Sequence, residues 1–326
     1  MVYLDPLRNE TNQYNEIQYR TLLSIGPVKQ FSLLSSYKYE KDDIVILNWF
    51  ENGLVNVNGR ISLKGMLRML LLFITCTFKR YNLIWVKHNR FPHAIKKTWL
   101  NIKLTNVFLK AYEHLSNRII VHSKSEVLTE KYIYIPHPLY EMSNIDFFEE
   151  ENSFFVFGAL KKYKKIEELI TEWPSNVTLH IYGKGDERYV DSLKVLAKGK
   201  EIFFNNLFLN DDQVVKLFCQ YKNCIISHMD ESAIVSGVFF MAKTFGNNIL
   251  INNKRGLDVA DFGDNLGVYK YNSFNLKSII EECMNSHSSR TSIYEESLMT
   301  NGHALIVEQW SYLVNSLERQ AKKDRS

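Results

Sequence analysis

Two acidic residues precede a Ser-Gly step in the segment MDESAIVSGVFFMAKTFG, residues 229–246. A helix rich in small residues is predicted to begin at Ser236 and Gly237. The first turn of a helix has unpaired N–H groups and a partial positive charge, so it attracts anions. Asp230 and Glu231 lie too close to the expected position of such an anion to be simple ligands of it. Because carboxylates accept hydrogen bonds from hydroxyls, we expect this pair to contact sugar or ribose hydroxyl groups.

A second anion-compatible helix start is predicted in FGALKKYKKIEEL, residues 157–169. The segment places a glycine at the end of an expected strand and then four lysines, Lys161, Lys162, Lys164 and Lys165. Flexible backbone and ammonium groups at the start of a helix suit a diphosphate. A solvated basic helix face is the alternative. The Ser236-Gly237 step favours the diphosphate, since two such sites could hold one nucleotide diphosphate from opposite sides.

The elements that position these motifs alternate between strand and helix. In the first half, strands are predicted at 43–50, 82–89 and 117–123, with helices at 62–79 and 93–114. This alternation predicts a parallel α/β sheet, whose ligands bind beyond the carboxyl ends of the strands. Residues able to form hydrogen bonds stand at all three of these ends: Asn48, Trp49, Glu51, His88, Asn89, His122 and Ser123.

The same alternation restarts in the second half of the chain. Strands are expected at 153–160, 177–185, 201–207, 223–229 and 248–253. The stretch between the halves, residues 135–153, has two prolines, five acids and no Lys or Arg, which is typical of a linker. We therefore expect an α/β fold with two Rossmann-like domains whose parallel sheets face a central cleft. The expected boundaries are residues 1–138, a linker at 139–152, residues 153–301, and a C-terminal helix at 302–326.

The cysteines and acidic pairs do not indicate a metal site. The four cysteines lack the C-x-x-C spacing of a zinc site, and no Asp-x-Asp adjoins a strand. Asp42-Asp43 and Asp211-Asp212 fall at the starts of elements, where capping explains them. We therefore expect no metal. The N-terminal residues lack the apolar core of a signal peptide, which favours a reduced, cytoplasmic protein.

A basic region overlaps an apolar segment in the first half. Residues 60–124 contain 13 Lys and Arg against one acid, Glu113, while the whole chain has a net charge of +4. Within this region, residues 62–81 read SLKGMLRMLLLFITCTFKRY, whose apolar run is shorter than the roughly 20 residues that span a bilayer. A buried helix and a helix lying on an anionic membrane both fit. On a membrane, four basic residues would lie among the headgroups: Lys64, Arg68, Lys79 and Arg80.

Four stretches of the second half resemble the nucleotide-sugar domain of GT-B glycosyltransferases. They are FGALKKYKKIEELI, LHIYGKGD, SHMDESAIVSGVFFMAKTFGNNILIN and DNLGVY. Families of this type open with G-x-[IL]-[RK]-x-Y-K, then have an acidic or polar loop, a Ser-Gly or Glu-Gly step and a helix ending A-x-x-x-G. The segment GHALIVEQWSYLV, residues 302–314, is similar to their closing helix, which returns to the N-terminal domain.

Three stretches of the first half resemble motifs of bacterial surface-polysaccharide transferases. NWFE (48–51), WVKHNRFPH (85–93) and VHSKSE (121–126) are similar to H-W-x-E, W-T-x-H-N-x-x-P-H and H-S-x-x-E. The resemblance covers nearly the whole chain. It implies a glycosyltransferase of capsule, O-antigen or exopolysaccharide assembly that moves a hexosyl group from a UDP- or GDP-sugar to a lipid-linked saccharide. The nucleotide sugar is then a co-substrate, and no cofactor is expected.

Carried over by position, the resemblance gives roles to residues of both halves. Lys161 and Lys164 would hold the donor diphosphate opposite Ser236 and Gly237. Asp230 and Glu231 would face the donor sugar. Tyr182 and Gly183 would lie near the nucleotide. Asn89 and His93 would contact the acceptor.

One departure from the pattern bears on the stereochemistry. Related retaining enzymes often have Glu-x7-Glu in this loop, whereas Phe239 stands eight residues after Glu231. The departure favours an inverting transfer, which needs a general base for the acceptor hydroxyl but no metal. The candidate bases are His88, Glu51 and Glu16.

Three other functions fit parts of the sequence. A catalytically inactive GT-B partner subunit is compatible with Lys at 161, where the pattern often has Arg. A nucleotide-sugar 2-epimerase shares the two-domain fold but has no use for the basic apolar segment. A nucleic-acid-binding protein would explain the basic charge, yet the basic residues are not interleaved with aromatic ones as in a stacking platform. We therefore expect an anionic inner-membrane surface, and no nucleic acid, as the partner of this region.

Overall fold

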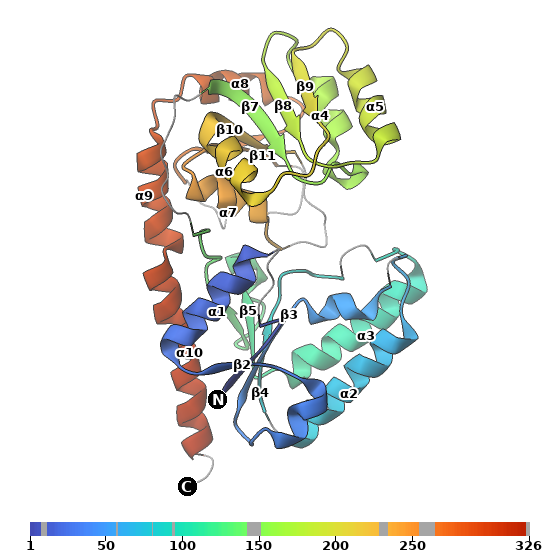
Figure 1. The fold of residues 1–326 in the computed structure, drawn as a ribbon, viewed down its shortest axis with the longest axis vertical. Helices are drawn as coiled ribbons and strands as arrows, with labels where there is room; N and C mark the ends of the chain where they lie inside the picture. The colour runs from blue at the N-terminus through green and yellow to red at the C-terminus, as the bar shows by residue number, and fades with distance from the viewer. Residues whose placement is uncertain are drawn as a thin grey trace. The chain divides into compact units, whose positions relative to one another are not determined.

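The computed structural model describes residues 1–7, 12–56, 58–79, 81–92, 95–141, 151–227, 234–253 and 265–323 (Figure 1). The chain forms two compact units. One contains Met1–Pro138, Ser232–Val235 and Asn301–Ser326, and the other contains Leu139–Glu231 and Ser236–Thr300. Each unit is built on one six-stranded sheet.

The first sheet is parallel throughout and has the order β2-β1-β3-β4-β5-β6. Its strands are β1 (Val2–Asp5), β2 (Val28–Gln30), β3 (Ile44–Asn48), β4 (Asn82–Val86), β5 (Arg118–Val121) and β6 (Tyr132–Tyr134). The three predicted strands correspond to β3, β4 and β5. The chain passes from β1 to β2 on one side and then to β3 on the other, so the strand order reverses between β1 and β3.

Helices cover both faces of this sheet (Figure 1). One face packs on α1 (Gln13–Ile25) and α10 (His303–Lys323), and the other on α2 (Leu63–Lys79) and α3 (Trp99–Leu115). Alternation along β3 divides its side chains between the two layers, as a pleated strand requires. Ile44 and Ile46 join the core with Trp310 of α10, whereas Val45 and Leu47 join the core with α2.

The second sheet is also parallel and has the order β12-β11-β10-β7-β8-β9. Its strands are β7 (Glu151–Phe157), β8 (Leu179–Tyr182), β9 (Ile202–Asn205), β10 (Tyr221–Ile226), β11 (Asn248–Asn252) and β12 (Val268–Tyr271). The order reverses between β7 and β10. Both sheets therefore have the doubly wound topology in which ligands bind at the reversal, beyond the carboxyl ends of the strands. The predicted α/β fold with two parallel sheets is confirmed.

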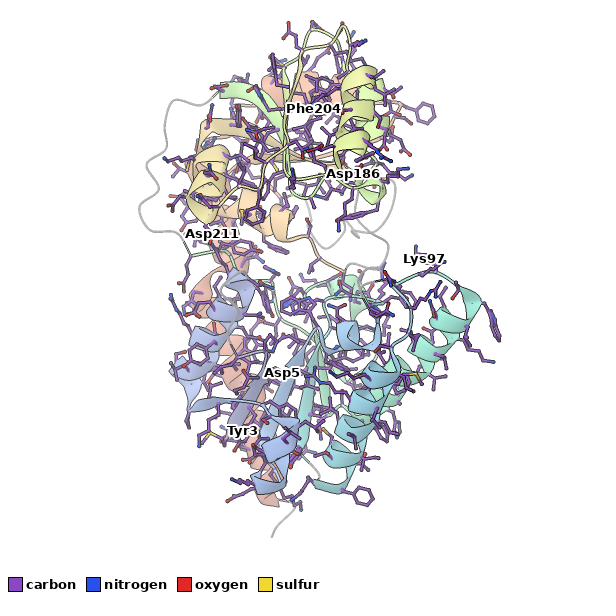
Figure 2. The ribbon with its side chains drawn as sticks, turned by 45° about the vertical axis from the view of Figure 1, so that its right-hand side comes forward. Tyr3, Asp5, Lys97, Asp186, Phe204 and Asp211 are labelled. Carbon is purple, nitrogen blue, oxygen red and sulfur yellow. The ribbon has the colours of Figure 1, made fainter. Side chains whose placement is uncertain are left out.

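Ten α-helices and four short 3₁₀ helices connect the strands within the described part of the chain. The helices of the second unit are α4 (Ile166–Glu172), α5 (Glu187–Leu196), α6 (Asp211–Gln220), α7 (Gly237–Thr244), α8 (Leu276–Met284) and α9 (Arg290–Asn301). The 3₁₀ helices are η1 (Leu33–Lys38), η2 (Phe50–Leu54), η3 (Lys124–Glu126) and η4 (Lys162–Lys164). Asp211 opens α6, as expected from its place at the start of a helix (Figure 2). The N-cap is Asn210, whose side-chain oxygen accepts from the Gln213 amide, so Asp211 does not itself cap the helix.

The packing of α10 on the first sheet gives a stability prediction. Trp310 is 2% exposed and lies in the core with strand residues of this sheet, whereas Tyr312, two residues on, is 79% exposed. We expect Trp310→Ala to lower the free energy of unfolding by about 3–5 kcal/mol, because it leaves a large cavity. Urea unfolding followed by circular dichroism measures the change. Tyr312→Ala is the matched control and should cost no more than about 0.5 kcal/mol; equal effects of the two variants would contradict the buried role of Trp310.

Candidate active site

The loop after β7 stands at the reversal of the second sheet. Gly158, the first residue after the strand, has φ +113°, a conformation that favours glycine. Its amide donates to the Tyr182 carbonyl at 3.1 Å. A Cβ atom at Gly158 would lie 2.6 Å from the Lys164 Nζ atom. The absence of a side chain at this position therefore lets the lysine ammonium fold over the end of the strand.

Lys164 is fixed in this loop by two hydrogen bonds. Its Nζ donates to the Phe157 carbonyl at 3.2 Å, and its own carbonyl accepts from the Ser227 hydroxyl at 2.8 Å. Ser227 directly follows β10, and Lys164 lies in the loop after β7. This bond therefore links the segments that follow the two strands at the reversal. Burial lowers the pKa of Lys164 to about 8, and the nearby charge of Lys161 also lowers it. An anionic ligand would stabilise the charged form of this buried ammonium, because its negative charge compensates for the hydration lost on burial.

The backbone at Gly183 packs closely against the loop after β7. Gly183, after β8, has φ +140°, and its amide donates to the Asn205 carbonyl at 3.0 Å. A Cβ atom there would come within 2.0 Å of the Gly158 carbonyl oxygen. Gly183 is thus required for backbone packing beneath the loop. Its neighbour Tyr182 hydrogen-bonds through its hydroxyl to the Tyr221 hydroxyl at 2.9 Å.

The other predicted donor residues lie at different places in the second unit. Lys161 is exposed at the start of η4. Ser236 is the N-cap of α7, as the sequence predicted, and its hydroxyl oxygen accepts from the Phe239 amide at 3.4 Å. Gly237 opens the helix beside the Tyr140 hydroxyl, which a Cβ atom would approach to 3.0 Å. Three predicted site residues lie outside the described part of the chain: Asp230, Glu231 and His93.

At the carboxyl ends of β3, β4 and β5, the first unit gathers aromatic and imidazole rings. We call this group the histidine cluster; it consists of Tyr14, Trp49, His88, His122 and His137. Tyr14 comes from α1 and contacts the other four rings at centroid distances of 4.7–5.5 Å. The three histidines are all buried. The cluster therefore lies at the edge of the sheet where ligands of doubly wound folds bind.

Hydrogen bonds fix the tautomers of two histidines in the cluster. His122 Nδ1 lies 2.7 Å from the Ile135 carbonyl, and His137 Nδ1 lies 2.7 Å from the Pro138 carbonyl. Because a carbonyl only accepts, both Nδ1 atoms carry the proton. His122 Nε2 then accepts from the Tyr14 hydroxyl at 2.8 Å. Burial lowers the pKa of His122 to about 4 and that of His137 well below its usual range. Both rings are neutral at pH 7 and orient their neighbours.

His88 has the opposite tautomer. Its Nε2 lies 3.2 Å from the Asn48 side-chain oxygen, while the Asn48 amide nitrogen donates to Gln18 at 2.8 Å. The Asn48 oxygen therefore accepts, and His88 Nε2 carries the proton. The ring stacks on Trp49 with a centroid distance of 3.9 Å and an interplanar angle of 12°. In this tautomer His88 Nδ1 carries no proton.

Glu51 is a fully buried carboxyl in η2, next to this cluster in sequence. Its Oε1 accepts from the Asn89 side-chain amide at 3.4 Å, while Oε2 has no hydrogen-bond partner among the described residues. Burial raises the pKa of Glu51 to about 7, although the Asn89 amide and the Lys87 charge oppose the shift. A carboxyl that titrates near pH 7 can accept a proton from a substrate hydroxyl at neutral pH.

Glu16 lies on another side of α1 from the cluster. Tyr14 and Gln18, four residues apart, both point toward the strand ends, where they bond to His122 and Asn48. Glu16 lies between them in sequence and therefore about 200° away around the helix. Its carboxylate pairs with Arg20 at 2.8 Å. The structure thus brings Glu51, Asn89 and His88 to one region of the first unit and directs Glu16 elsewhere.

The sequence alone gives no role to Tyr14, His137 or Ser227. Tyr14 is 108 residues from its partner His122 and carries no local motif. His122 and Ser123 were noted at a predicted strand end, but without a partner. Ser227 lies within the strand predicted at 223–229 and directly follows the observed β10, so its position at the topological reversal is the signal that could have identified it.

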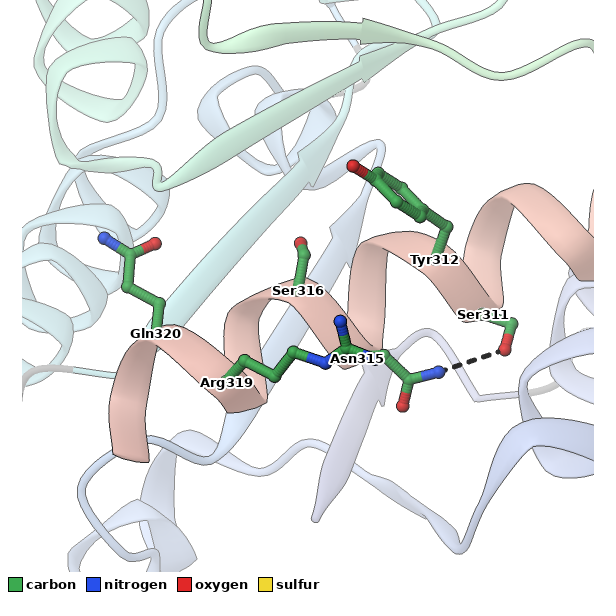
Figure 3. Close-up of a pocket in the computed structure, with 6 residues that line it drawn as sticks. All are labelled: Ser311, Tyr312, Asn315, Ser316, Arg319 and Gln320. Carbon is green, nitrogen blue, oxygen red and sulfur yellow. Dashed lines mark hydrogen bonds between the residues drawn. The ribbon is translucent and has the colours of Figure 1, made fainter. Parts of the chain in front are cut away.

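A surface pocket of about 400 Å³ lies elsewhere, on α10 (Figure 3). Its lining comes from this one helix: Ser311, Tyr312, Asn315, Ser316, Arg319 and Gln320. The Asn315 side chain donates to the Ser311 hydroxyl at 3.3 Å. No strand-end residue lines the pocket, so we do not place the substrate there.

Burial of Glu51 predicts a pH-dependent stability. Its pKa is about 7 in the folded protein against an ordinary 4.5, so unfolding releases a proton between these values. The penalty for holding Glu51 in the fold is absent below about pH 4.5 and grows to about 3 kcal/mol above pH 7. We expect Glu51→Gln to remove this penalty, so that the variant gains stability relative to the natural protein as pH rises over this window.

Chemical unfolding at several pH values measures the effect. Glu187→Gln, on the exposed surface of α5, controls for the loss of one carboxyl group. A constant difference between Glu51→Gln and the natural protein across the window would show that Glu51 does not titrate within it.

Comparison with known proteins places the fold. No protein-family model and no curated protein sequence matches this chain. Among solved structures, Anabaena Alr3699/HepE in complex with UDP superposes with a TM-score of 0.61 at 14% identity, over 92% of this chain and 89% of that one. AviGT4, a glycosyltransferase involved in avilamycin A biosynthesis, has a TM-score of 0.61 at 12% identity, over 97% of both chains.

A third similar structure is the pneumococcal O-GlcNAc transferase GtfA in complex with UDP and GlcNAc. It has a TM-score of 0.55 at 17% identity, and the match covers 87% of this chain but 58% of that one. Of these three neighbours, AviGT4 is described as a glycosyltransferase and GtfA as an O-GlcNAc transferase. The two-sheet chain described above has the GT-B fold.

Proposed function

We propose that the protein is a glycosyltransferase that moves a hexosyl group from a nucleotide diphosphate sugar to a lipid-linked saccharide in bacterial surface-polysaccharide synthesis. The observation that carries this proposal is the loop at the reversal of the second sheet. There Gly158 leaves room for the Lys164 ammonium, and the Ser227 hydroxyl donates to the backbone carbonyl of Lys164. UDP is the favoured nucleotide, because HepE and GtfA were solved with UDP. GDP is the alternative.

The donor diphosphate is proposed to bind Lys164 and Lys161, with Ser236 and Gly237 at the start of α7 as the opposite contact. Charge-assisted hydrogen bonds from ammonium to phosphate are stronger than neutral ones. Asp230 and Glu231 are proposed to bind hydroxyls of the donor sugar, and Tyr182 and Gly183 to lie near the nucleotide. The lysines supply positive charge to the departing diphosphate, so this scheme requires no metal.

The transfer is proposed to invert the configuration at the donor carbon. The acceptor hydroxyl oxygen forms a bond to that carbon as the bond to the diphosphate oxygen breaks, and a base takes the hydroxyl proton. Glu51, His88 and Glu16 are the candidate bases. The pKa of Glu51 near 7 and its neighbour Asn89 favour Glu51 among the three. Asn89 and His93 are the proposed acceptor contacts. The polysaccharide pathway and a cytoplasmic, membrane-associated location rest on the likeness of NWFE, WVKHNRFPH and VHSKSE to transferase motifs.

Nucleotide binding tests the donor site. We expect Lys164→Gln to weaken binding of UDP roughly ten- to hundredfold, because a charge-assisted hydrogen bond contributes about 1.5–3 kcal/mol. Isothermal titration with UDP, GDP, CMP and dTDP measures the affinities. Lys165→Gln is the matched control, since the adjacent Lys165 pairs with Glu168 at 3.0 Å. The affinity of the natural protein should also fall above pH 8, where Lys164 loses its charge.

The other outcomes of this titration decide between functions. Equal losses in Lys164→Gln and Lys165→Gln would contradict the assigned diphosphate contact. Binding of no nucleotide would favour an inactive GT-B partner subunit. A separate incubation with a UDP-sugar and no acceptor tests the remaining function, because conversion of the sugar to its 2-epimer would identify an epimerase.

Turnover tests the assignment of the base. We expect Glu51→Gln to lower kcat by roughly 10²–10⁴, which is the usual contribution of a general base. The pH profile of kcat in the natural protein should fall on the acid side of about pH 7, where Glu51 becomes protonated. Release of UDP from UDP-hexoses in the presence of a bacterial lipid extract measures turnover.

Glu16→Gln serves as the comparison, because Glu16 lies on another side of α1. It should retain turnover within about threefold of the natural protein. A large loss in Glu16→Gln together with an unchanged Glu51→Gln would reassign the base.

A further inference from the structure

Helix α2 has an apolar stripe on its exposed side. Six apolar side chains with at least 40% exposure make up this stripe: Leu63, Leu67, Leu70, Leu71, Ile74 and Phe78. Their spacing places them within about 100° of one another around the helix. Leu63 and Phe78, near its two ends, are 81% and 82% exposed. A helix on the surface of a globular protein normally carries polar residues on this side.

The stripe is not needed for the core of the first unit. The opposite side of α2 already supplies Met69, Leu72 and Cys76 to the core shared with β3 and β4. The helix is therefore apolar on two sides, of which one faces the sheet and the other faces outward. Contiguous exposed apolar patches of this kind mark sites of protein or membrane interaction.

Helix α3 continues the exposed surface. Trp99, Leu100 and Val107 are 74%, 55% and 60% exposed and alternate with Lys103 and Lys110 along one side of the helix. The Lys103 ammonium lies 4.8 Å from the centre of the Trp99 ring. Trp99, Val107 and the two lysines, with Ile102 and Asn106, line a pocket of about 360 Å³. Trp beside Lys is the arrangement expected at a membrane interface, where an amphipathic ring and a cation sit at the level of the headgroups.

The two helices present their exposed sides together. The Tyr112 hydroxyl of α3 donates to the Met69 carbonyl of α2 at 2.5 Å, and both helices cover the same face of the first sheet (Figures 1 and 2). Their sides away from the sheet therefore form one surface, which we call the α2–α3 outer face.

The positive charge of the α2–α3 outer face, together with its apolar side chains, distinguishes between three kinds of partner. The two helices carry five basic residues and one acid: Lys64, Arg68, Lys79, Lys103 and Lys110, with Glu113. Nucleic acid would use the cations but gain little from six exposed aliphatic and aromatic side chains. A second copy would place like charges opposite one another across a two-fold axis. An anionic bilayer uses both features, since it accepts apolar side chains below its charged headgroups.

We propose that the α2–α3 outer face docks the protein on an anionic phospholipid bilayer, with its apolar stripe and Trp99 inserted at the boundary between headgroups and acyl chains. Within the described part of the chain, no helix is long and apolar enough to cross a membrane, so α2 and α3 lie in the plane of the interface. This surface extends beyond the segment that the sequence indicated, because it adds α3. The docking needs no nucleotide, so it can be tested independently of the proposed transferase activity.

Vesicle co-sedimentation of the full chain tests the proposal without any nucleotide present. We expect binding to phosphatidylcholine vesicles that contain phosphatidylglycerol, little binding to phosphatidylcholine alone, and weakening at high salt. Leu67→Gln/Leu71→Gln should reduce the apparent affinity at least about tenfold. Lys103→Glu/Lys110→Glu should reduce it by at least about 25-fold, because each basic residue near an anionic surface contributes about a factor of five.

Matched controls lie on the second unit. Val195→Gln/Leu196→Gln alters exposed apolar residues of α5, and Lys216→Glu/Lys277→Glu alters exposed lysines of α6 and α8. Both controls should bind vesicles within about twofold of the natural protein. Thermal unfolding checks that every variant is folded. Trp99→Gln, in the first turn of α3, is the second variant if the leucine pair fails to fold.

Three results would overturn the proposal. Vesicle binding that is the same in the α2–α3 variants and the natural protein would place the docking surface elsewhere. A shift from dimer to monomer in the leucine variant, without vesicle binding by the natural protein, would identify a second copy as the occupant. Binding of duplex or single-stranded DNA that is lost in the lysine variant, again without vesicle binding, would identify nucleic acid.

Discussion

The parallel direction of every strand is the constraint on which both candidate sites depend. In a parallel sheet all carboxyl ends meet at one edge, so residues far apart in sequence become neighbours there. At the second sheet this edge brings together Gly158, Lys164 and Ser227, which follow β7 and β10. The backbone contact between the loops after β7 and β8 then requires Gly183, because a Cβ atom would overlap the Gly158 carbonyl. The position of the lysine is thus set by two glycines and by the topology, and its lowered pKa follows from that position.

The parallel direction of the strands also places several buried polar groups at one edge of the first sheet. Buried polar groups of this kind must be neutral or paired. His122 and His137 meet this requirement as neutral rings whose Nδ1 atoms donate to backbone carbonyls. Glu51 meets it incompletely, since one carboxyl oxygen has no partner among the described residues. The cost appears as a raised pKa, which is also what a base acting at neutral pH needs. At Glu51, the burial that destabilises the fold above pH 7 also makes the carboxyl suited to proton transfer.

How far the sequence predicts this structure depends on the length of each signal. Strands β3, β4 and β5 have four or five apolar-rich residues and were predicted, as was α7 with its N-cap Ser236. Four strands were not predicted: β2 and β6, with three residues each, and β1 and β12, with four. Such short runs show a period only weakly. Local motifs located Lys164, Glu51 and His88. They could not locate Tyr14, whose role depends on a contact across 108 residues, nor show that Glu16 lies on another side of α1.

Helix α2 shows why hydropathy alone left two interpretations open. A run of apolar residues is compatible with a helix buried in the core and with one lying on a membrane, because composition does not say which side faces the sheet. The structure divides the run: Met69, Leu72 and Cys76 enter the core, while the stripe that includes Leu67 and Phe78 is exposed. The two sides of α2 are therefore under different constraints. The inner side stabilises the first unit, so it tolerates only substitutions that preserve volume. The outer side is exposed, and the proposed docking on a bilayer accounts for its apolar character.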